Sequence, residues 1–334
     1  MNRRNFIAAS VCALTLTALA GCKQCSLAGV ASASRESLDS GDYRALRRFT
    51  KTRFGDVAHV DVGIGPVALF LHGFPLNGFQ WRGAIARLSP YRRCIAPDFL
   101  GLGHTRVAEG GNVAPAAQVE MLVSLLDALA IPSVDLVAND SGGAVAQLLV
   151  VRHPQRVRTL LLTNCDVETN SPPPALLPVI ELARQGRFAD EWLAPWRADK
   201  ALARSSKGIG GMCYADPAQP TDDAIETYFA PLLASKRSRE LLHAYAIALE
   251  RNALTGIEAE LRRSTVPTRI VWGAGDTIFS PASPDYLDHT FGASRGVRHL
   301  QGSKLFWPEE RPDVIAEEAR RLWNAWAPQA AGWR

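Results

Sequence analysis

Short apolar runs rich in β-branched residues alternate with amphipathic stretches along most of the chain. In residues 115–130, apolar side chains recur every three or four positions and so share one face of a helix. Strands are predicted at 67–71, 93–96, 134–138, 157–163, 268–272 and 297–300, and helices at 78–88, 115–130, 144–151 and 313–326. Strands that alternate with helices form a mainly parallel sheet with helices on both faces. The predicted fold class is therefore α/β.

This alternation is interrupted in the middle of the chain. Residues 169–262 include three consecutive prolines from Pro172, several helical stretches and no convincing strand. A helical block inserted between two strands of one sheet is interpreted as a cap over a functional site, with proline turns and polar loops at its ends. We predict a core of residues 46–168 and 263–334 and a helical cap of residues 169–262.

The start of the chain has the composition of an export signal. Arg3 and Arg4 precede an apolar stretch that ends in Leu-Ala-Gly-Cys at Cys22. The paired arginines resemble a twin-arginine signal, and Leu-Ala-Gly-Cys resembles the bacterial lipobox, in which the cysteine is lipid-modified and becomes the new first residue. We predict a signal peptide at 1–21 and a flexible tether at 22–45, where Ser, Ala and Gly are frequent.

The whole chain is predicted to be an exported periplasmic or cell-envelope lipoprotein, held at the membrane by a lipid anchor on Cys22, with twin-arginine export as the candidate route. The alternative is an ordinary cleaved signal with a coincidental cysteine. No later apolar run reaches the ~20 residues needed to cross a bilayer, so we expect the body to be soluble. A formal net charge of +4 is too small to indicate nucleic-acid binding. The expected partners are the membrane, through the lipid anchor, and a small-molecule substrate.

One predicted strand runs directly into a predicted helix at Asp140. A nucleophile elbow needs small residues two positions before and two positions after the nucleophile, because larger side chains collide with the turn. For Asp140 these positions are Ala138 and Gly142, whereas for Ser141 the first would be Asn139, a poor fit. The sterics favour Asp140 as the nucleophile. An alternative is that this segment only caps the helix, which does not explain the paired glycines after Ser141.

The elbow is one of a series of motifs in a characteristic order. The others are Leu-His-Gly-Phe-Pro at 71–75, Asp-Phe-Leu-Gly-Leu-Gly at 98–103 and Trp-Gly-Ala-Gly-Asp at 272–276. Their order and spacing resemble those of the α/β-hydrolase superfamily, over residues 47–334 except for the cap. Within the superfamily, the chain resembles the branch with an aspartate nucleophile, the epoxide hydrolases and haloalkane dehalogenases.

The resemblance implies roles for individual residues. The backbone N–H groups of Phe74 and Ser141 would form an oxyanion hole. Asp276 matches the acid that orients the catalytic histidine, and Asp166 stands at a second position used for that acid in some relatives; each has the alternative of a loop or helix-capping carboxylate. His72 resembles the structural histidine of its loop. No cofactor and no metal ion are predicted.

The pattern fails at one position. Leu305 stands where the superfamily has its catalytic histidine, and the Glu-Glu-x-Pro motif that starts at Glu309 anchors this register. An aspartate can open an epoxide without a base, but release of the resulting ester needs a water activated by one. A serine nucleophile needs a base before it can attack. The candidate substitute bases are His243 and Lys304, with a structural histidine and a solvated loop lysine as the alternatives.

Two further departures concern the substrate. Haloalkane dehalogenases generally have tryptophan after the nucleophile and often asparagine after His-Gly, where this chain has Ser141 and Phe74, so dehalogenation is disfavoured. Epoxide hydrolases polarise the epoxide oxygen with cap tyrosines, for which Tyr214, Tyr228 and Tyr245 are candidates, or else packing residues.

Three hypotheses follow. The leading one is a hydrolase that acts on a small, largely apolar ester- or epoxide-like substrate through nucleophile Asp140. The second is a non-hydrolytic protein on the same fold that binds a ligand or assists its rearrangement, which the presence of Leu305 favours. The third is a serine esterase that uses Ser141.

Overall fold

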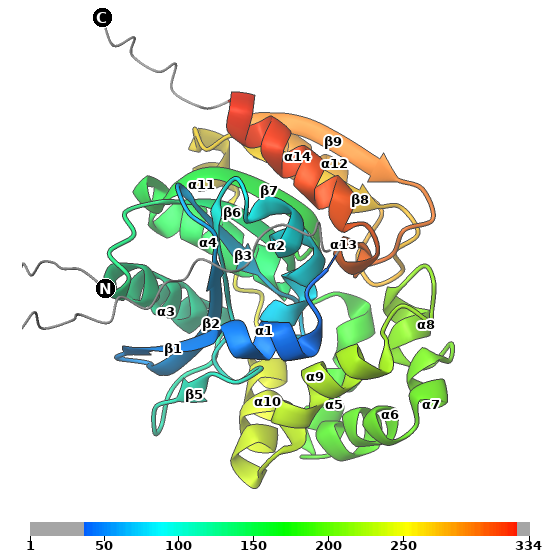
Figure 1. The fold of residues 1–334 in the computed structure, drawn as a ribbon. Coiled ribbons are helices and arrows are strands. Elements are labelled where there is room, and N and C mark those ends of the chain that lie inside the picture. The colour runs from blue at the N-terminus through cyan, green and yellow to red at the C-terminus, as the bar shows by residue number, and fades with distance from the viewer. Residues whose placement is uncertain (1–36, 326–334) are drawn as a thin grey trace, which may run out of the picture. The chain divides into compact units, whose positions relative to one another are not determined.

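The predicted strands lie in one sheet, whose order is β1-β2-β4-β3-β6-β7-β8-β9, with β5 paired to β2 (Figure 1). The computed structural model describes residues 37–325. The strands are β1 (Arg47–Thr52), β2 (Gly55–Val62), β3 (Val67–Leu71), β4 (Arg93–Pro97), β5 (Arg106–Val107), β6 (Val134–Asp140), β7 (Val157–Cys165), β8 (Thr268–Gly273) and β9 (Ser294–Leu300). From β4 to β9 every neighbouring pair is parallel, whereas β2 is antiparallel to its neighbours. The predicted α/β fold with a mainly parallel sheet is confirmed.

Helices cover both faces of the sheet centre, and every residue of β3 and β6 is therefore buried. One group contains α2 (Arg82–Leu88) and α14 (Pro312–Ala325), which pack on each other. The other contains α3 (Pro115–Ala128), α4 (Ser141–Arg152), α11 (Glu258–Arg263) and α12 (Ser283–Thr290). None of the helices within the described residues is long and apolar enough to span a bilayer.

The folded part begins earlier than the sequence suggested. Helix α1 (Ser40–Leu46) occupies the end of the predicted tether 22–45. Tyr43 of this helix is buried and meets Phe79 edge to face at 5.2 Å between ring centroids. The tether prediction is therefore wrong for its last residues, because an aromatic anchor docks them on the core. The predicted signal peptide 1–21 and Cys22 lie outside the described residues.

A layer of helices stands between β7 and β8 in the chain, at the lower right of Figure 1. It contains η3 (Pro174–Leu176), α5 (Leu177–Arg184), the π-helix η4 (Ala189–Leu193), α6 (Ala194–Ala198), α7 (Lys200–Arg204), α8 (Ile209–Cys213), α9 (Asp222–Leu233) and α10 (Lys236–Ala248). Helix α11, assigned to the cap by the predicted boundary at 262, packs instead on α4 and α12 of the core. The cap therefore ends before α11.

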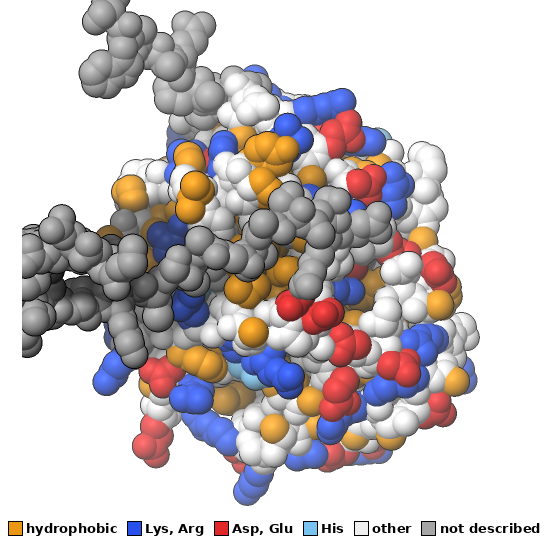
Figure 2. Space-filling model, in the orientation of Figure 1, with side chains coloured by type: hydrophobic (Ala, Val, Ile, Leu, Met, Phe, Trp, Pro, Cys, Tyr) orange, Lys and Arg blue, Asp and Glu red, His pale blue; other side chains and the backbone are white. Residues whose placement is uncertain are grey.

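On the face shown in Figure 2, acidic and basic side chains are interspersed.

A buried polar cluster joins the cap to the core. Arg82 of α2 forms an ion pair with Glu309 of α13 (Trp307–Glu310), whose side chain is 2% exposed. From the cap, the Tyr214 hydroxyl donates to Glu309, and the Tyr228 hydroxyl accepts from Arg82 at 3.2 Å. Both tyrosines are thus committed to this cluster.

Candidate active site

The chain bends sharply where β6 meets α4. Asp140 at this point has φ 55° and ψ −133°, a conformation that L-residues rarely adopt. A Cβ atom on Gly143 would stand 2.3 Å from the Cβ of Cys165, so the first turn of α4 needs glycine there to pass β7. The bend expected at Asp140 is present. It places the side-chain carboxyl group beyond the edge of the sheet at which the parallel strands end.

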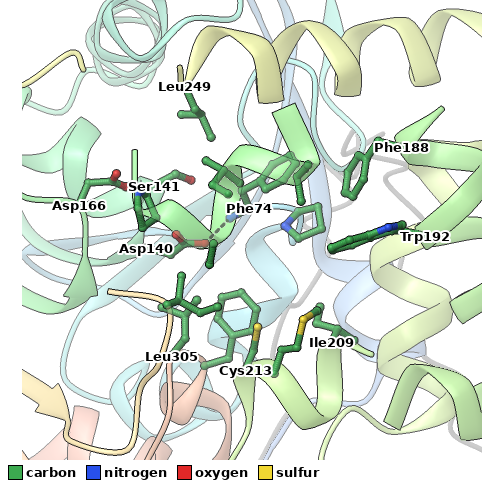
Figure 3. Close-up of a pocket in the computed structure, with 18 of the residues that line it drawn as sticks. Phe74, Asp140, Ser141, Asp166, Phe188, Trp192, Ile209, Cys213, Leu249 and Leu305 are labelled. Carbon is green, nitrogen blue, oxygen red and sulfur yellow. Dashed lines mark hydrogen bonds between the residues drawn. The ribbon is translucent and has the colours of Figure 1, made fainter. Parts of the chain in front are cut away.

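The Asp140 carboxylate faces two backbone N–H groups. Its Oδ2 accepts a hydrogen bond of 2.8 Å from the N–H of Phe74, and the N–H of Ser141 also donates to this carboxyl group. The first contact is the dashed line in Figure 3. These are the amides that the sequence analysis assigned to an oxyanion hole, and they hold one side of the carboxylate in place.

Side-chain amides fix the loops around this arrangement. Gln80 accepts from the N–H of Gly73 at 2.8 Å and donates to Asn139 Oδ1 at 2.6 Å. Asn139 in turn donates to Thr163 Oγ1 at 2.8 Å and to the carbonyl oxygen of Leu305 at 3.1 Å. Asn139 thus ties the elbow to both neighbouring loops, which explains a polar residue at this buried position.

A cavity of about 110 Å³ opens above Asp140. Figure 3 shows Asp140, Ser141 and Asp166 on one side of it and Phe188 and Trp192 on the other. The remaining lining is apolar apart from a thiol: Phe74, Pro75, Pro173, Ala175, Leu176, Val179, Trp196, Ile209, Met212, Cys213, Leu249, Ile278, Leu305 and Phe306. The site therefore suits a small, apolar molecule with one reactive group near the carboxylates.

Two carboxyl groups share this apolar space. Burial and the charge of Asp166 raise the pKa of Asp140 well above its usual range, while the N–H donors of Phe74 and Ser141 oppose the shift. Burial raises the pKa of Asp166 to about 6, against a stabilising hydrogen bond from the Ser171 side chain. Carboxyl groups with pKa values moved toward neutrality are characteristic of proton-transfer sites.

Asp166, expected from the sequence only as an alternative to Asp276 for the orienting acid, is itself part of the cavity lining. It follows Cys165, the residue of β7 that pairs with Asp140, so both carboxyls leave the same edge of the sheet. Its side chain lines the cavity and the residue is 6% exposed. The signal was readable: an aspartate ends the strand next to the elbow strand.

Asp276 is not among the residues that line the cavity. It accepts hydrogen bonds of 2.8 Å from Asn164 Nδ2 and from the N–H of Ile278. Leu305 lines the cavity and is 3% exposed. No histidine among residues 37–325 lines the cavity. Asp276 thus has amide donors as partners in place of an imidazole.

The expectation that His243 or Lys304 replaces the histidine is not supported. His243 Nε2 accepts a hydrogen bond of 3.1 Å from the N–H of Ala189 within the cap. Lys304 Nζ donates to the carbonyl oxygen of Gly211 at 2.6 Å. Both side chains are turned away because nearby backbone groups bind their nitrogens, and neither lines the cavity.

Two other side chains have settled positions. His72 is buried, with Nδ1 bonded to the carbonyl oxygen of Gly73 and Nε2 accepting from the N–H of Phe99, as a structural histidine would be. The Ser141 hydroxyl lies 3.1 Å from the hydroxyl of Tyr245. Of the three cap tyrosines, Tyr245 therefore reaches the elbow, whereas the other two are held in the cap–core cluster.

Residues 66–303 match the model of the alpha/beta hydrolase fold family. The chain belongs to this family. A relative among these hydrolases, epoxide hydrolase 3 of Siraitia grosvenorii, is 38% identical over 290 residues, which cover 76% of this chain and 90% of the relative. The 2-hydroxy-6-oxo-2,4-heptadienoate hydrolase of Pseudomonas putida is 39% identical over 105 residues, 30% of this chain and only 38% of that enzyme.

The fold of this α/β-hydrolase family member is also similar to that of solved structures. The epoxide hydrolase CorEH, solved without ligand, superposes with a TM-score of 0.69 at 17% identity, covering 84% of this chain and 98% of that chain. At this identity the likeness concerns the fold alone. All three similar proteins have names that describe hydrolases. The two relatives found by sequence differ in the substrate that is named: an epoxide for one and 2-hydroxy-6-oxo-2,4-heptadienoate for the other.

Proposed function

We propose that this protein is a hydrolase that acts on a small, largely apolar ester- or epoxide-like substrate, with Asp140 as the nucleophile. The observation that carries the proposal is the position of the Asp140 carboxylate, which lies at a strained bend and faces an apolar cavity. Its Oδ2 accepts from the N–H of Phe74, and the N–H of Ser141 also donates to the carboxyl group. A strained backbone that is held by surrounding contacts is characteristic of functional positions.

The arrangement suits nucleophilic attack on carbon. The carboxylate oxygen that Phe74 does not hold would attack an electrophilic carbon, and the bond from that carbon to its leaving oxygen would break. In the ester that results on Asp140, the carbonyl oxygen would remain beside the two N–H donors. The same donors would then stabilise the oxyanion when water attacks that ester.

The cavity lining supports an epoxide more than a haloalkane. Phe74 and Ser141 replace the residues that hold a departing halide in the dehalogenases, whereas an epoxide oxygen stays attached to its product. Tyr245 lies at the elbow through its contact with Ser141 and stacks on Phe74, with 5.6 Å between centroids and 2° between planes. The name of the long-matching relative, an epoxide hydrolase, supports the same choice.

A serine esterase is the weaker candidate. The Ser141 hydroxyl has Tyr245 as its neighbour, and burial raises the pKa of that phenol well above its usual range. A neutral phenol is a poor base for a serine hydroxyl. The non-hydrolytic alternative rests on Leu305, which fills the position of the expected base.

Intact-protein mass measurement tests these candidates. The protein without its first 22 residues would be exposed to panels of aliphatic epoxides, haloalkanes and esters. We expect diol formation and, in samples quenched with acid during turnover, a mass increase equal to the whole epoxide; both should be lost in Asp140→Asn and kept in Ser141→Ala. An organophosphonate adduct on Ser141 would instead support the esterase, and absence of both adduct and turnover would support ligand binding alone.

We also propose that the protein is an exported periplasmic or cell-envelope lipoprotein anchored through Cys22. The proposal rests on the Leu-Ala-Gly-Cys sequence that ends the apolar stretch. Expression with a labelled fatty acid in a bacterial host should give a labelled protein in the membrane fraction. Cys22→Ala should remove the label; equal labelling of both would overturn the assignment.

A further inference from the structure

We propose that the Asp166 carboxyl group is the proton carrier of this site, first donating to the oxygen of an opening epoxide and then accepting from the water that hydrolyses the Asp140 ester. The proposal rests on the proposed function, since it needs Asp140 as the nucleophile. It supplies the base that the histidine at the position of Leu305 would have provided.

The placement of Asp166 follows from the sheet. Cys165 pairs with Asp140 in the parallel register of β7 and β6, so Asp166 begins one residue beyond the nucleophile on the neighbouring strand. Both side chains line the same cavity, on the side that also carries Ser141 (Figure 3). A group in this position shares the reaction space of the nucleophile.

Asp166 is also available for proton transfer. Its carboxyl group receives hydrogen bonds from the Ser171 side chain and from its own backbone N–H, and no ion pair of the described residues involves it. Asp276, in contrast, does not line the cavity and accepts hydrogen bonds from Asn164 and from the N–H of Ile278. Of the described side chains that line the cavity, Asp166 is thus the carboxyl group left after the nucleophile is assigned.

The groups that face Asp166 favour a shared proton. Its titratable neighbours are Asp140 on β6, Cys165 on β7 and Tyr245 on α10, each of which feels its charge. Two carboxyl groups in one apolar cavity do not both ionise readily, so the pair keeps one proton near neutral pH. Attack needs the arrangement in which Asp140 is ionised and Asp166 carries the shared proton, and the N–H donors of Phe74 and Ser141 stabilise that form of Asp140.

The opening step uses that proton. A carboxylate oxygen of Asp140 forms a bond to an epoxide carbon, and the bond from this carbon to the epoxide oxygen breaks. The electron pair goes to the oxygen, which takes the proton from Asp166. The products are a hydroxyalkyl ester on Asp140 and an ionised Asp166.

The hydrolysis step returns it. Water adds to the carbonyl carbon of the ester and gives one proton to Asp166, while Phe74 and Ser141 N–H groups hold the oxyanion. Collapse breaks the bond to the alkyl oxygen, which takes the proton from Asp166 and leaves as a diol. Asp140 is left as a carboxylic acid and passes its proton to Asp166. The sum is epoxide plus water to diol, with no net proton change.

The first test is Asp166→Asn in the otherwise unchanged soluble form, with an aliphatic epoxide as the probe. We expect at least a 100-fold loss of diol formation and, at high epoxide concentration, a persistent adduct on Asp140. Asp166→Glu should recover part of the rate. The matched control is Asp56→Asn on β2, an exposed carboxylate, which should keep full turnover and show no lasting adduct.

The second test is a pH profile that a purely structural role would not move. The Ser171 side chain lowers the pKa of Asp166, so Ser171→Ala should raise that pKa and shift the acid limb of single-turnover ester hydrolysis upward by about 1 pH unit. An unchanged limb, or full diol formation in Asp166→Asn with an adduct still formed on Asp140, would overturn the role of Asp166 alone. No adduct in any variant, with turnover retained in Asp140→Asn, would overturn the nucleophile itself.

Discussion

Gly142 lies directly against the carbonyl oxygen of His72: a Cβ atom added to this glycine would stand 2.6 Å from that oxygen. The contact sets how closely the first turn of α4 approaches the end of β3. Because Asp140 precedes this turn, the same contact sets the distance from its carboxylate to the N–H of Phe74. A missing side chain on one residue thus positions the reactive group of another.

Gly142→Ala should therefore affect both stability and the site. Forcing a methyl group into this contact should reduce the free energy of unfolding by about 1–3 kcal/mol and slow adduct formation on Asp140. Urea unfolding and adduct mass measure the two effects. The control is Gly41→Ala on α1, where the neighbouring atom within 4 Å is the helix-capping Oδ1 of Asp39, at 3.2 Å; a shift of a few tenths of an ångström accommodates the methyl group, so this variant should be close to neutral. A Gly142→Ala protein that unfolds and reacts like the parent would remove the steric argument for the elbow.

The sheet centre and the elbow could be predicted from sequence because their causes are local. Strand β6 is buried along its whole length and so reads as a continuous apolar run. The small residues around Asp140 follow from the geometry of one turn. Edge strand β1, with sequence Arg-Arg-Phe-Thr-Lys-Thr, was missed because it is polar and half-exposed; even its Phe49 is 45% exposed.

Residues whose positions depend on distant contacts could not be predicted. Tyr214 and Tyr228 were candidates to polarise an epoxide oxygen because they lie in the predicted cap. In the structure, their hydroxyls bind the buried ion pair of two core helices instead. His243 and Lys304 are bound by backbone groups far along the chain. Asp166 was within reach, because the strand order of the fold makes its neighbour Cys165 a partner of Asp140.

The cap–core cluster should contribute strongly to stability. Glu309→Gln would leave Arg82, whose side chain is 14% exposed, without its anionic partner. We expect a loss of about 3–5 kcal/mol in the free energy of unfolding, measured by urea unfolding. The control is Glu120→Gln, which weakens the contacts of this carboxylate with Arg53 and His153 near the surface and should cost less than about 1 kcal/mol. Equal effects of the two substitutions would show that the buried pair does not hold the cap.

Restoring a histidine tests whether the site still accepts the usual base. Leu305→His would place an imidazole in the cavity lining. In the Asp166→Asn background, we expect it to raise diol formation by about 100-fold, because a second base becomes available for ester hydrolysis. Leu305→Gln is the control, since it adds a polar group that cannot act as a base. No gain over this control, in a folded protein that still forms the adduct, would show that the pocket no longer supports histidine-dependent hydrolysis.

The buried Asp166 should make the protein less stable as the pH rises. Its pKa is about 6 when folded, above the value near 4 of an unfolded carboxyl group. Between about pH 4 and pH 6 this carboxyl group therefore binds more protons in the folded protein than in the unfolded chain, so its contribution to the free energy of unfolding decreases with rising pH, by about 3 kcal/mol in all. Asp166→Asn has no such penalty and should be more stable than the parent at pH 7, with a flatter pH profile in urea unfolding. Asp56→Asn should keep the parent profile. A parent profile that Asp166→Asn leaves unchanged would mean that Asp166 ionises in the folded protein without cost.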